Sequence, residues 1–422
     1  IRPGWFYHKS EDNLVRSLED MLKVYYGSVG GNGQFLLNIP PDCRGLFHEN
    51  DVARLKQIGD VLKTTFAQNL AADAKLTAEV EGGKSVGDVN VVLDGNPDTF
   101  WTTTDGSSSV TLIAELAAPV RANCLMLQEH IASGQRVEAF NMEVFTDNQW
   151  RPAVGYTVIG CKRLVRFDDV NVSSVRIRFT KFRVRPTLAD IGLYFAPAVI
   201  SAPKVARNTN GAVTITVPQG TCVRYTLDGS NPTESSQLYA GPIQMLQGGL
   251  IIAQTFPLTP GRNIASAGSA ITRMEFGLVK AKWKILDCDS QDGPEVNPRK
   301  AIDEDPKTYW HSQFRGKVDP MPHHISVDMG EMVSIHGFTY LPRQDQWDGG
   351  IILRARFEVS QDGQNWTIAA DNVDFDNVVN SRQQQVVKLK TDIPARYFRL
   401  TALRTANDSG LASAADISVL VK

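Results

Sequence analysis

The chain of 422 residues has few cysteines, and their spacing argues against two common uses of sulfur. There are five, an odd number, far apart and without any Cys-x-x-Cys pair. A disulfide framework or a zinc site would require paired or closely spaced cysteines. We therefore expect all five to be buried apolar side chains rather than ligands or cross-links: Cys43, Cys124, Cys161, Cys222 and Cys288.

Long apolar runs and an excess of charge of one sign are also missing. No apolar run approaches the roughly 20 residues that span a bilayer. The 44 basic and 46 acidic residues leave a net charge of −2, so no global field attracts nucleic acid or an anionic membrane, and neutral ligands fit better. The chain begins without methionine or a signal peptide, in the middle of a pattern, and we interpret it as the C-terminal part of a longer protein.

Helical periodicity is confined to residues 1 to about 70. Apolar positions at spacings of three and four follow Ser10, which we expect to cap a helix that ends at Gly27. The apolar residues 35–39 predict a short strand covered on both faces, and a second helix is expected from about Asn50. An extended segment, helix, strand and helix in this order are typical of a parallel βα fold.

From residue 75 onward, short β-rich runs alternate with turn residues, as in β-sandwiches. Two regions repeat one another, because residues 94–101 and 303–310 share the pattern Asp-x-(Asn/Asp)-Pro-x-Thr-aromatic-Trp. Residues 143–150 match 358–366 as a strand, an Asp-led turn and a tryptophan. Further matches follow in the same order, which indicates a duplicated domain: 178–180 with 399–401, and 188–191 with 414–417.

Four units result from this pattern. Residues 1–70 form the end of a parallel βα fold and residues 71–197 a β-sandwich. Residues 198–284 form a small Ig-like spacer around a strand that runs into an Asp-Gly turn, and residues 285–422 a second sandwich.

These units resemble known families. Residues 1–66, with Arg-Pro-Gly-Trp-Phe-Tyr, Asn-Ile-Pro-Pro-Asp and Arg-Gly-Leu in order, resemble the end of the catalytic barrel of family 29 α-L-fucosidases. Residues 71–197 resemble the discoidin-like, or F5/8 type C, sandwich that follows that barrel. The spacer resembles the chitobiase and hexosaminidase C-terminal domain through Arg-Tyr-Thr-Leu-Asp-Gly-Ser, and residues 285–422 resemble an F5/8 type C domain of carbohydrate-binding module family 32 (CBM32).

The expected fold class is therefore multidomain and mainly β. It comprises the tail of a (β/α) barrel, a galactose-binding or discoidin-like β-sandwich, an Ig-like spacer and a second discoidin-like β-sandwich.

The fucosidase resemblance implies a retaining glycosidase with two catalytic carboxyl groups. In that family both lie upstream of the Arg-Pro-Gly-Trp segment, so we expect no catalytic residue in this chain and no hydrolysis by it alone. Glu11 and Asp12 are the acids nearest that segment. We expect them in the first turn of a helix, where acids stabilise the helix dipole.

Trp5 is the candidate substrate-binding residue. It stands where a barrel strand gives way to its βα loop, the rim that builds active sites in such barrels. Its indole face could pack on the apolar C5-methyl side of fucose, a role that the resemblance also implies. The alternative is a core tryptophan beneath the loop. Arg2 and His8 are expected to be hydrogen-bonding residues of the loop.

The repeated motif brings together the oxygen ligands that calcium prefers. Resemblance to discoidin-type modules suggests a structural Ca²⁺ site in each copy, with no catalytic cofactor, and the second copy, which is richer in carboxylates, is the better candidate. The alternative is an Asx-turn, in which the first aspartate bonds its own backbone. The predicted ligands are Asp303, Asp305, Thr308 and Asp416 in the second copy, and Asp94, Asn96, Thr99 and Asp190 in the first.

The second sandwich also carries the candidate glycan-binding residues His311, Arg343 and Trp347, an aromatic platform beside charged donors. The alternative is an internal ion pair between Arg343 and Asp345, with Trp347 partly packed. For the first sandwich we favour packing against the barrel over independent glycan binding. We expect the remaining sandwich tryptophans in the cores: Trp101, Trp150, Trp310 and Trp366.

The resemblances imply the C-terminal part of a secreted, periplasmic or cell-surface exo-α-L-fucosidase. Its partners would be fucosylated glycans or other host or plant oligosaccharides, with no nucleic acid and no membrane insertion. The alternative is a non-catalytic carbohydrate-binding or adhesion protein. A phospholipid-binding discoidin protein would need apolar spikes beside a basic surface, and the neutral charge balance argues against it.

Overall fold

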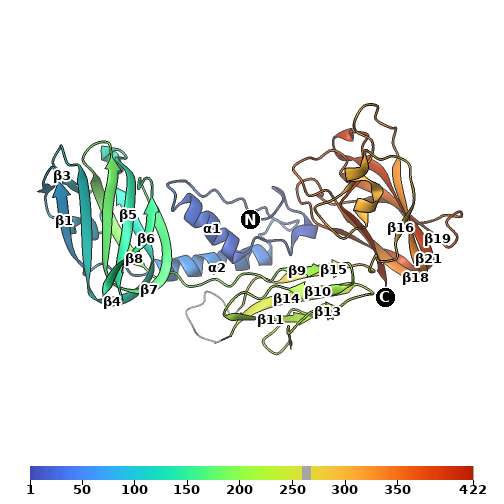
Figure 1. The fold of residues 1–422 in the computed structure, drawn as a ribbon, viewed down its shortest axis with the longest axis horizontal. Helices are drawn as coiled ribbons and strands as arrows, with labels where there is room; N and C mark the ends of the chain where they lie inside the picture. The colour runs from blue at the N-terminus through green and yellow to red at the C-terminus, as the bar shows by residue number, and fades with distance from the viewer. Residues whose placement is uncertain (259–267, 422) are drawn as a thin grey trace.

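The structure is a computed structural model that describes residues 1–258 and 268–421. Figure 1 shows four units, in which the N-terminal helical unit lies between the two larger β-sandwiches and a small β-module lies alongside. The architecture is mainly β, as expected. None of the described helices is long and apolar enough to cross a membrane.

The N-terminal unit contains a 3₁₀ turn, η1 (Lys9–Glu11), and two helices, α1 (Leu18–Ser28) and α2 (Glu49–Thr65). The cap predicted at Ser10 is wrong. Ser17 caps α1, because its hydroxyl accepts a hydrogen bond from the Asp20 amide. The Ser-x-x-Asp spacing that starts at Ser17 satisfies the capping pattern directly before the apolar face.

The strand predicted at residues 35–39 does not form a ladder with any described residue. The segment instead packs Phe35, Leu37 and Ile39 against the helices. The buried centre of this unit comes from the predicted helical faces and the chain start: Ile1, Leu18, Met21, Leu22, Ile58 and Val61.

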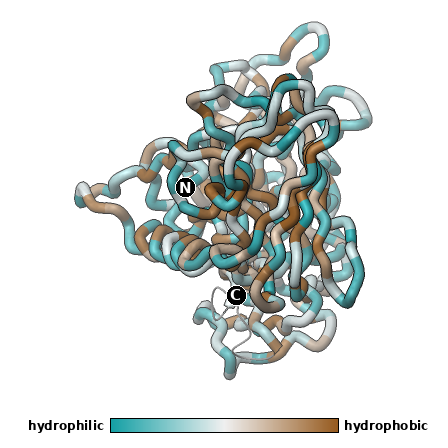
Figure 2. The backbone as a smooth tube through the Cα atoms, turned by 90° about the vertical axis from the view of Figure 1, so that its left-hand side faces the viewer, coloured by the Kyte–Doolittle hydropathy of each residue, from teal (hydrophilic) through white to brown (hydrophobic). Residues whose placement is uncertain are grey.

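The first sandwich has strand order β2-β3-β8-β4-β7-β5-β6, with β1 paired to β4. The long strands β4 and β7 shift register at Glu115/Val120 and Ala122/Cys124, so that they bend and serve both layers. Figure 2 looks onto this side of the molecule and shows apolar and polar stretches alternating along the chain. Its elements are β1 (Lys75–Glu81), β2 (Ser85–Val86), η2 (Val89–Leu93), β3 (Trp101–Thr103), β4 (Ser109–Glu129), η3 (Ile131–Ser133), β5 (Val137–Thr146), β6 (Gln149–Tyr156), β7 (Arg163–Phe182) and β8 (Thr187–Tyr194).

The spacer consists of two small sheets, ordered β13-β10-β9 and β12-β11-β14-β15, over an apolar core. The predicted Asp-Gly turn is present, since Asp228 accepts a hydrogen bond from the Ser230 amide and Gly229 adopts a φ of +86°. Its strands are β9 (Val205–Arg207), β10 (Ala212–Ile215), β11 (Thr221–Thr226), β12 (Gln237–Leu238), β13 (Ile243–Gln244), β14 (Gly249–Pro257) and β15 (Thr272–Phe276).

The second sandwich repeats the plan of the first. Its main sheet has the order β16-β18-β21-β19-β20 with β23 on β18, and β17 pairs with β22. Two long strands, β18 and β21, again bend across both layers. Its elements are β16 (Lys284–Cys288), η4 (Pro294–Val296), η5 (Pro298–Ala301), β17 (Trp310–His311), β18 (His323–Leu341), β19 (Ile352–Ser360), β20 (Thr367–Asp374), β21 (Gln385–Thr405), η6 (Ala406–Asp408), β22 (Ser413–Ala414) and β23 (Asp416–Val421).

The four sandwich tryptophans divide into two kinds. Trp101 and Trp310 are fully buried, as expected. Trp150 and Trp366 are half-buried at the surface, so the prediction that they belong to the core is wrong. Each is covered by an arginine guanidinium, Arg176 at 4.3 Å for Trp150 and Arg399 at 4.2 Å for Trp366, an arrangement in which the cation replaces apolar packing.

All five cysteines are free, and Cys124 alone is fully buried. Cys43 and Cys161 are exposed, so the expectation of buried thiols fails for them. Both stand in turns between regular elements, where the backbone stays near solvent.

Contacts join the units. The first sandwich packs on the helices through the rings of Tyr194 and Phe66, which lie 5.0 Å apart, and through the Gly30 carbonyl, which accepts from the Leu164 amide. The spacer is fixed to the second sandwich by an ion pair between Arg207 and Glu304 at 2.7 Å. The first sandwich thus provides the bracing expected of it.

Candidate glycan-binding sites

The Trp5 side chain is 66% exposed on a bend near the chain start. Its backbone is held, because the Asn38 side-chain amide donates to the Trp5 carbonyl at 2.7 Å, and the Ile1 amino group donates to the Asn38 carbonyl at 3.0 Å. In the described part of the chain the indole is therefore a surface side chain on a fixed backbone. The alternative of a core tryptophan is not what the structure shows.

Arg2 anchors this loop from below. Its guanidinium is buried and donates to both carboxylate oxygens of Asp51, at 3.2 and 2.9 Å, and to Asp12 at 3.0 Å. It also lies 5.1 Å from the centre of the Tyr7 ring. A buried arginine paired with two carboxylates fixes geometry, as expected for a loop hydrogen-bonding residue.

Glu11 and Asp12 do not lie in the first turn of an α-helix, because α1 begins only at Leu18. Glu11 is fully buried, and its carboxylate accepts hydrogen bonds from the Gly4 amide at 3.1 Å and from the Asn377 side chain at 2.5 Å. Both acids therefore have structural partners.

A hollow of about 600 Å³ lies beside Trp5. Aromatic and apolar side chains of the N-terminal unit form one side of it, and the second sandwich contributes two asparagines. An apolar surface with a few convergent polar groups is the usual composition of a small-ligand site. The lining residues include Trp5, Phe6, His8, Phe35, Asn377 and Asn380.

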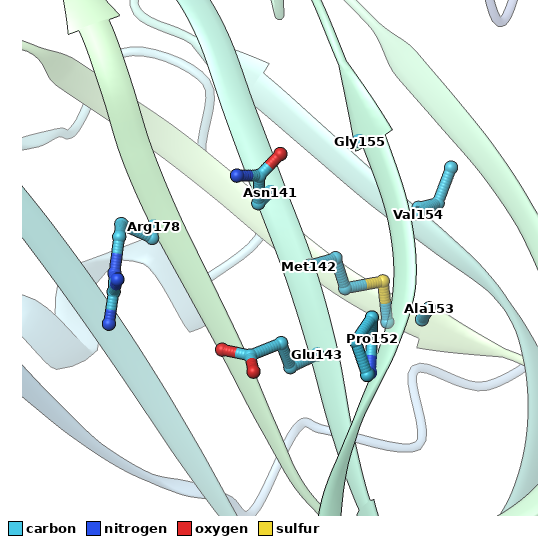
Figure 3. Close-up of a pocket in the computed structure, with 8 residues that line it drawn as sticks. All are labelled: Asn141, Met142, Glu143, Pro152, Ala153, Val154, Gly155 and Arg178. Carbon is cyan, nitrogen blue, oxygen red and sulfur yellow. The ribbon is translucent and has the colours of Figure 1, made fainter.

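A second hollow, of about 450 Å³, lies on the outer face of β5, β6 and β7 (Figure 3). Asn141 and Glu143 line it from β5 and Arg178 from β7. Its lining contains no aromatic ring, whereas sugars are commonly bound on one. The Trp5 hollow is therefore the better candidate for a sugar.

In the second copy, the predicted calcium ligands already have protein partners. Asp303 accepts hydrogen bonds from the Thr308 hydroxyl at 2.8 Å and from the Asp305 amide at 3.0 Å. This is the Asx-turn considered as the alternative. Asp416, at the start of β23, forms an ion pair with Lys280 of the spacer instead of facing the turn as a bare ligand.

The first copy differs. Asp94 again accepts from the hydroxyl of Thr99, at 2.7 Å, and from the Asn96 amide, at 2.7 Å. Burial raises the pKa of Asp190, and the negative charge of Asp94 raises it further. Asp190 accepts a hydrogen bond from the neutral Gln128 amide at 3.2 Å, whereas its counterpart Asp416 is paired with a lysine, so the first copy retains more negative charge for a cation.

Among the described residues, no group of three or more His, Cys, Asp or Glu side chains could hold a metal ion. Any Ca²⁺ here would take most of its ligands from backbone, amide and hydroxyl oxygens, which calcium accepts.

The three predicted glycan-binding residues lie around one loop with very different exposure. Trp347 is 64% exposed. Arg343 is buried and binds Asp345 through two hydrogen bonds, at 2.7 and 2.6 Å, while its guanidinium lies 4.4 Å from the Tyr309 ring centre. Although burial favours the protonated acid, Arg343 lowers the pKa of Asp345. The internal ion pair considered as the alternative is thus observed.

His311 is buried as well, and its ring nitrogens contact the Ser312 and Gly349 carbonyls at 2.7 and 3.3 Å. Burial lowers the pKa of His311. His311 and Arg343 therefore support the loop, and of the three residues only Trp347 has an exposed side chain.

Sequence reasoning missed three residues that reach the Trp5 region from the loop between β20 and β21: Asp376, Asn377 and Asn380. The run Asp374-Phe375-Asp376-Asn377 marks a turn, but nothing in it indicates a contact with Glu11, 366 positions away.

Two bent β-sandwiches of matching topology, each with an Asp-led turn before a buried tryptophan, define a modular protein of the discoidin class. The chain belongs to the F5/8 type C domain family, whose family model matches residues 75–195 and 286–417, more than half of the sequence. The α-L-fucosidase model matches residues 1–65, and the chitobiase/β-hexosaminidase C-terminal domain model matches residues 205–258. The resemblances to α-L-fucosidases, to F5/8 type C domains in both sandwiches and to the chitobiase C-terminal domain are confirmed.

Individual proteins are similar to parts of this chain. The chain is 35% identical over 198 residues to putative alpha-L-fucosidase 1 of Oryza sativa subsp. japonica, covering 46% of this chain and 38% of that protein. It is 35% identical over 200 residues to alpha-L-fucosidase 1 of Arabidopsis thaliana, covering 46% and 39%. The chain thus spans less than two fifths of the length of these relatives. A crystal structure of a putative alpha-L-fucosidase from Bacteroides ovatus aligns with the whole chain and 51% of its own, at 26% identity and a TM-score of 0.39.

Proposed function

We propose that the protein to which these four units belong is a retaining exo-α-L-fucosidase that removes terminal fucose from glycans. The observation that carries this proposal is the exposed Trp5 indole, held on a fixed backbone beside a hollow of about 600 Å³. The apolar C5-methyl side of fucose would pack on the indole, and its hydroxyls would face polar groups.

We further propose that the 422-residue chain binds fucose without hydrolysing fucosides. Retaining glycosidases need two carboxyl groups about 5 to 5.5 Å apart that can reach the sugar. The acids nearest Trp5 are occupied, Glu11 by Gly4 and Asn377 and Asp12 by Arg2. Neither has the freedom of a nucleophile or an acid.

Binding of L-fucose to the 422-residue chain tests the site. Trp5→Ala should weaken binding at least tenfold, because the apolar platform is lost, while Asn171→Ala, at an exposed position of the first sandwich, serves as the control and leaves it unchanged. Calorimetry or saturation-transfer NMR would measure this. Unchanged affinity in the Trp5 variant would remove the basis of the proposal, and release of nitrophenol from a nitrophenyl fucoside by this chain would refute its inactivity.

The second sandwich would hold the enzyme on carbohydrate through Trp347. Its indole is the exposed platform, and the ion pair of Arg343 with Asp345 keeps the loop in shape. We propose fucosylated glycans, or host or plant oligosaccharides that carry them, as partners, and a secreted, periplasmic or cell-surface location, where such glycans occur. Assignment to CBM32 in particular is part of this proposal. A glycan array with wild-type chain and Trp347→Ala tests it.

A further inference from the structure

The second sandwich touches the Trp5 loop directly, through side chains of the segment between β20 and β21. The Asp376 carboxylate contacts the His8 ring at 2.8 Å and accepts a hydrogen bond from the Ser10 hydroxyl at 2.5 Å. Next to it, Asn377 donates to the buried carboxylate of Glu11. The residues on either side of the contact are more than 360 positions apart.

Gly4 permits this approach. A Cβ atom at position 4 would lie 2.6 Å from the Asn377 side-chain nitrogen, so a larger residue there would require the Asn377 side chain to move. The Gly4 amide and Asn377 also share one carboxylate, since both donate to Glu11. The glycine directly before Trp5 is therefore the point at which the two units meet.

The contacting loop is firmly held in its own domain. The Phe375 ring is buried and stacks on the Tyr340 ring at 4.8 Å, and Val378 is buried as well. At its far end Arg382 forms an ion pair with Asp348, the neighbour of Trp347, at 2.5 Å. Both ends of the loop are thus fixed, which lets it present polar groups at defined positions.

The hollow beside Trp5 belongs to both units, because Asn377 and Asn380 line it together with Trp5 and Phe6. Asn380 is exposed and donates to the Asn377 side chain at 2.8 Å. Side-chain amides offer donors and acceptors together, which suits the hydroxyl groups of a sugar.

We propose that this loop, residues 375–382, is part of the substrate site and binds the sugar to which the terminal fucose is attached. The inference rests on the proposed function, because it takes Trp5 as the platform for fucose. An exo-acting enzyme holds the terminal sugar, so every further sugar lies on the leaving-group side. Asn377 and Asn380 line the hollow from the second sandwich rather than from the unit that carries Trp5, and we assign them to the aglycone.

Trp5 itself can report the binding. The chain has seven tryptophans, each of which gives a ¹⁹F NMR signal in a sample labelled with 5-fluorotryptophan. The signal that is missing from the spectrum of the Trp5→Phe variant is that of Trp5. The wild-type chain would be titrated with L-fucose and with a trisaccharide that carries α-1,3-linked fucose on N-acetyllactosamine. Because only the Trp5 signal is followed, binding at Trp347 does not interfere.

The trisaccharide should bind the Trp5 site at least fivefold more tightly than L-fucose, and Asn380→Ala should remove most of that gain while leaving L-fucose binding unchanged. Asn171→Ala, an exposed asparagine of the first sandwich, is the matched control. Equal affinity for both sugars, or an Asn380 variant that weakens both alike, would overturn the role of the loop alone. A Trp5 signal that neither sugar shifts would overturn the proposed function first.

Discussion

A missing side chain and a buried charge decide the geometry around Trp5. Gly4 leaves room for Asn377, and the Glu11 carboxylate binds both neighbours. Removing that carboxylate would leave a buried amide without a partner, which costs more than the hydrogen bond itself contributes. We expected Glu11 in the first turn of a helix, but in the structure its carboxylate joins the N-terminal unit to the second sandwich.

A buried histidine in the second sandwich makes stability depend on pH. Burial of His323 favours its neutral form, but its hydrogen bond to Asp289, at 2.7 Å, outweighs burial and raises its pKa. A raised histidine pKa stabilises the fold fully below the ordinary value of 6.5, and the effect is lost as pH rises through the folded value. The pKa of Asp289 is lowered, so its contribution is lost in acid.

The variant His323→Gln should therefore lower the melting temperature more at pH 5.5 than at pH 8.5. Thermal unfolding of wild type and variant at both pH values measures the difference in melting temperature between them. The effects of the other titrating groups cancel in this difference. His336→Gln, with a less buried histidine that also faces an aspartate at 2.7 Å, is the comparison. The same loss at both pH values would show that the pair is not charged.

Two serines near α1 differ in role, and the one predicted to cap the helix is not the one that does so. Ser17 caps α1, whereas Ser10 donates to Asp376 of the second sandwich. Ser17→Ala should cost about 1 kcal/mol and speed hydrogen exchange in residues 18–28. Ser10→Ala should leave that helix protected and speed exchange near residue 376 instead. Mass spectrometry of both variants separates the two roles, and an unprotected helix in the Ser10 variant would contradict the assignment.

The Asp-led turns carry the calcium proposal. We propose that Ca²⁺ orders the first copy, where the side-chain partner of Asp190 is the neutral amide of Gln128, whereas Asp416 in the second copy is paired with Lys280. Calcium should raise the melting temperature, and a chelator should lower it, by the linkage of binding to folding. Asp94→Asn should abolish the shift while Asp303→Asn keeps most of it. A shift lost only in the Asp303 variant would place the ion in the second copy.

Local chemistry explains which elements could be predicted. The hairpin turn at Asp147 and Asn148 takes positive φ values of 50° and 60°, and the turn before Trp366 is ordered by Asp362. Such turns depend on a few adjacent residues, so the duplicated strands were recognisable. The conformation of segment 35–39 could not be predicted, because an apolar run does not reveal whether a partner strand exists. The exposure of Trp150 and Trp366 could not be predicted either, because the arginines that cover them lie on a distant strand.

At the scale of the whole molecule, the same distinction holds. Composition and repeats predict four units, and the family matches confirm what they resemble. The way the units touch depends on pairs such as Arg207 with Glu304 and Lys280 with Asp416, each joining residues far apart in sequence. For this reason the sequence predicts Asp416 as a metal ligand, whereas in the structure its partner is Lys280.

The contact between the first and last units should set the overall dimensions in solution. Replacing Asp376 and Asn377 together by alanine should enlarge the radius of gyration measured by small-angle X-ray scattering, because it removes both the exposed contacts of Asp376 and the hydrogen bond of Asn377 to the buried Glu11 carboxylate. Asp374→Ala, which breaks an ion pair with Arg354 inside the sandwich, is the control. An unchanged radius in the double variant would show that other contacts hold the units together.

The hydrogen bond between Glu11 and Asn377 also sets an order of events during synthesis. At 5 to 20 residues per second, roughly 20 to 70 seconds separate the emergence of Glu11 from that of Asn377. Throughout that time the N-terminal segment can fold around Arg2 and Asp51. The Glu11 carboxylate, however, gains its Asn377 partner only after the second sandwich has been synthesised. The Trp5 loop is thus synthesised well before the residue that completes its hydrogen bonding.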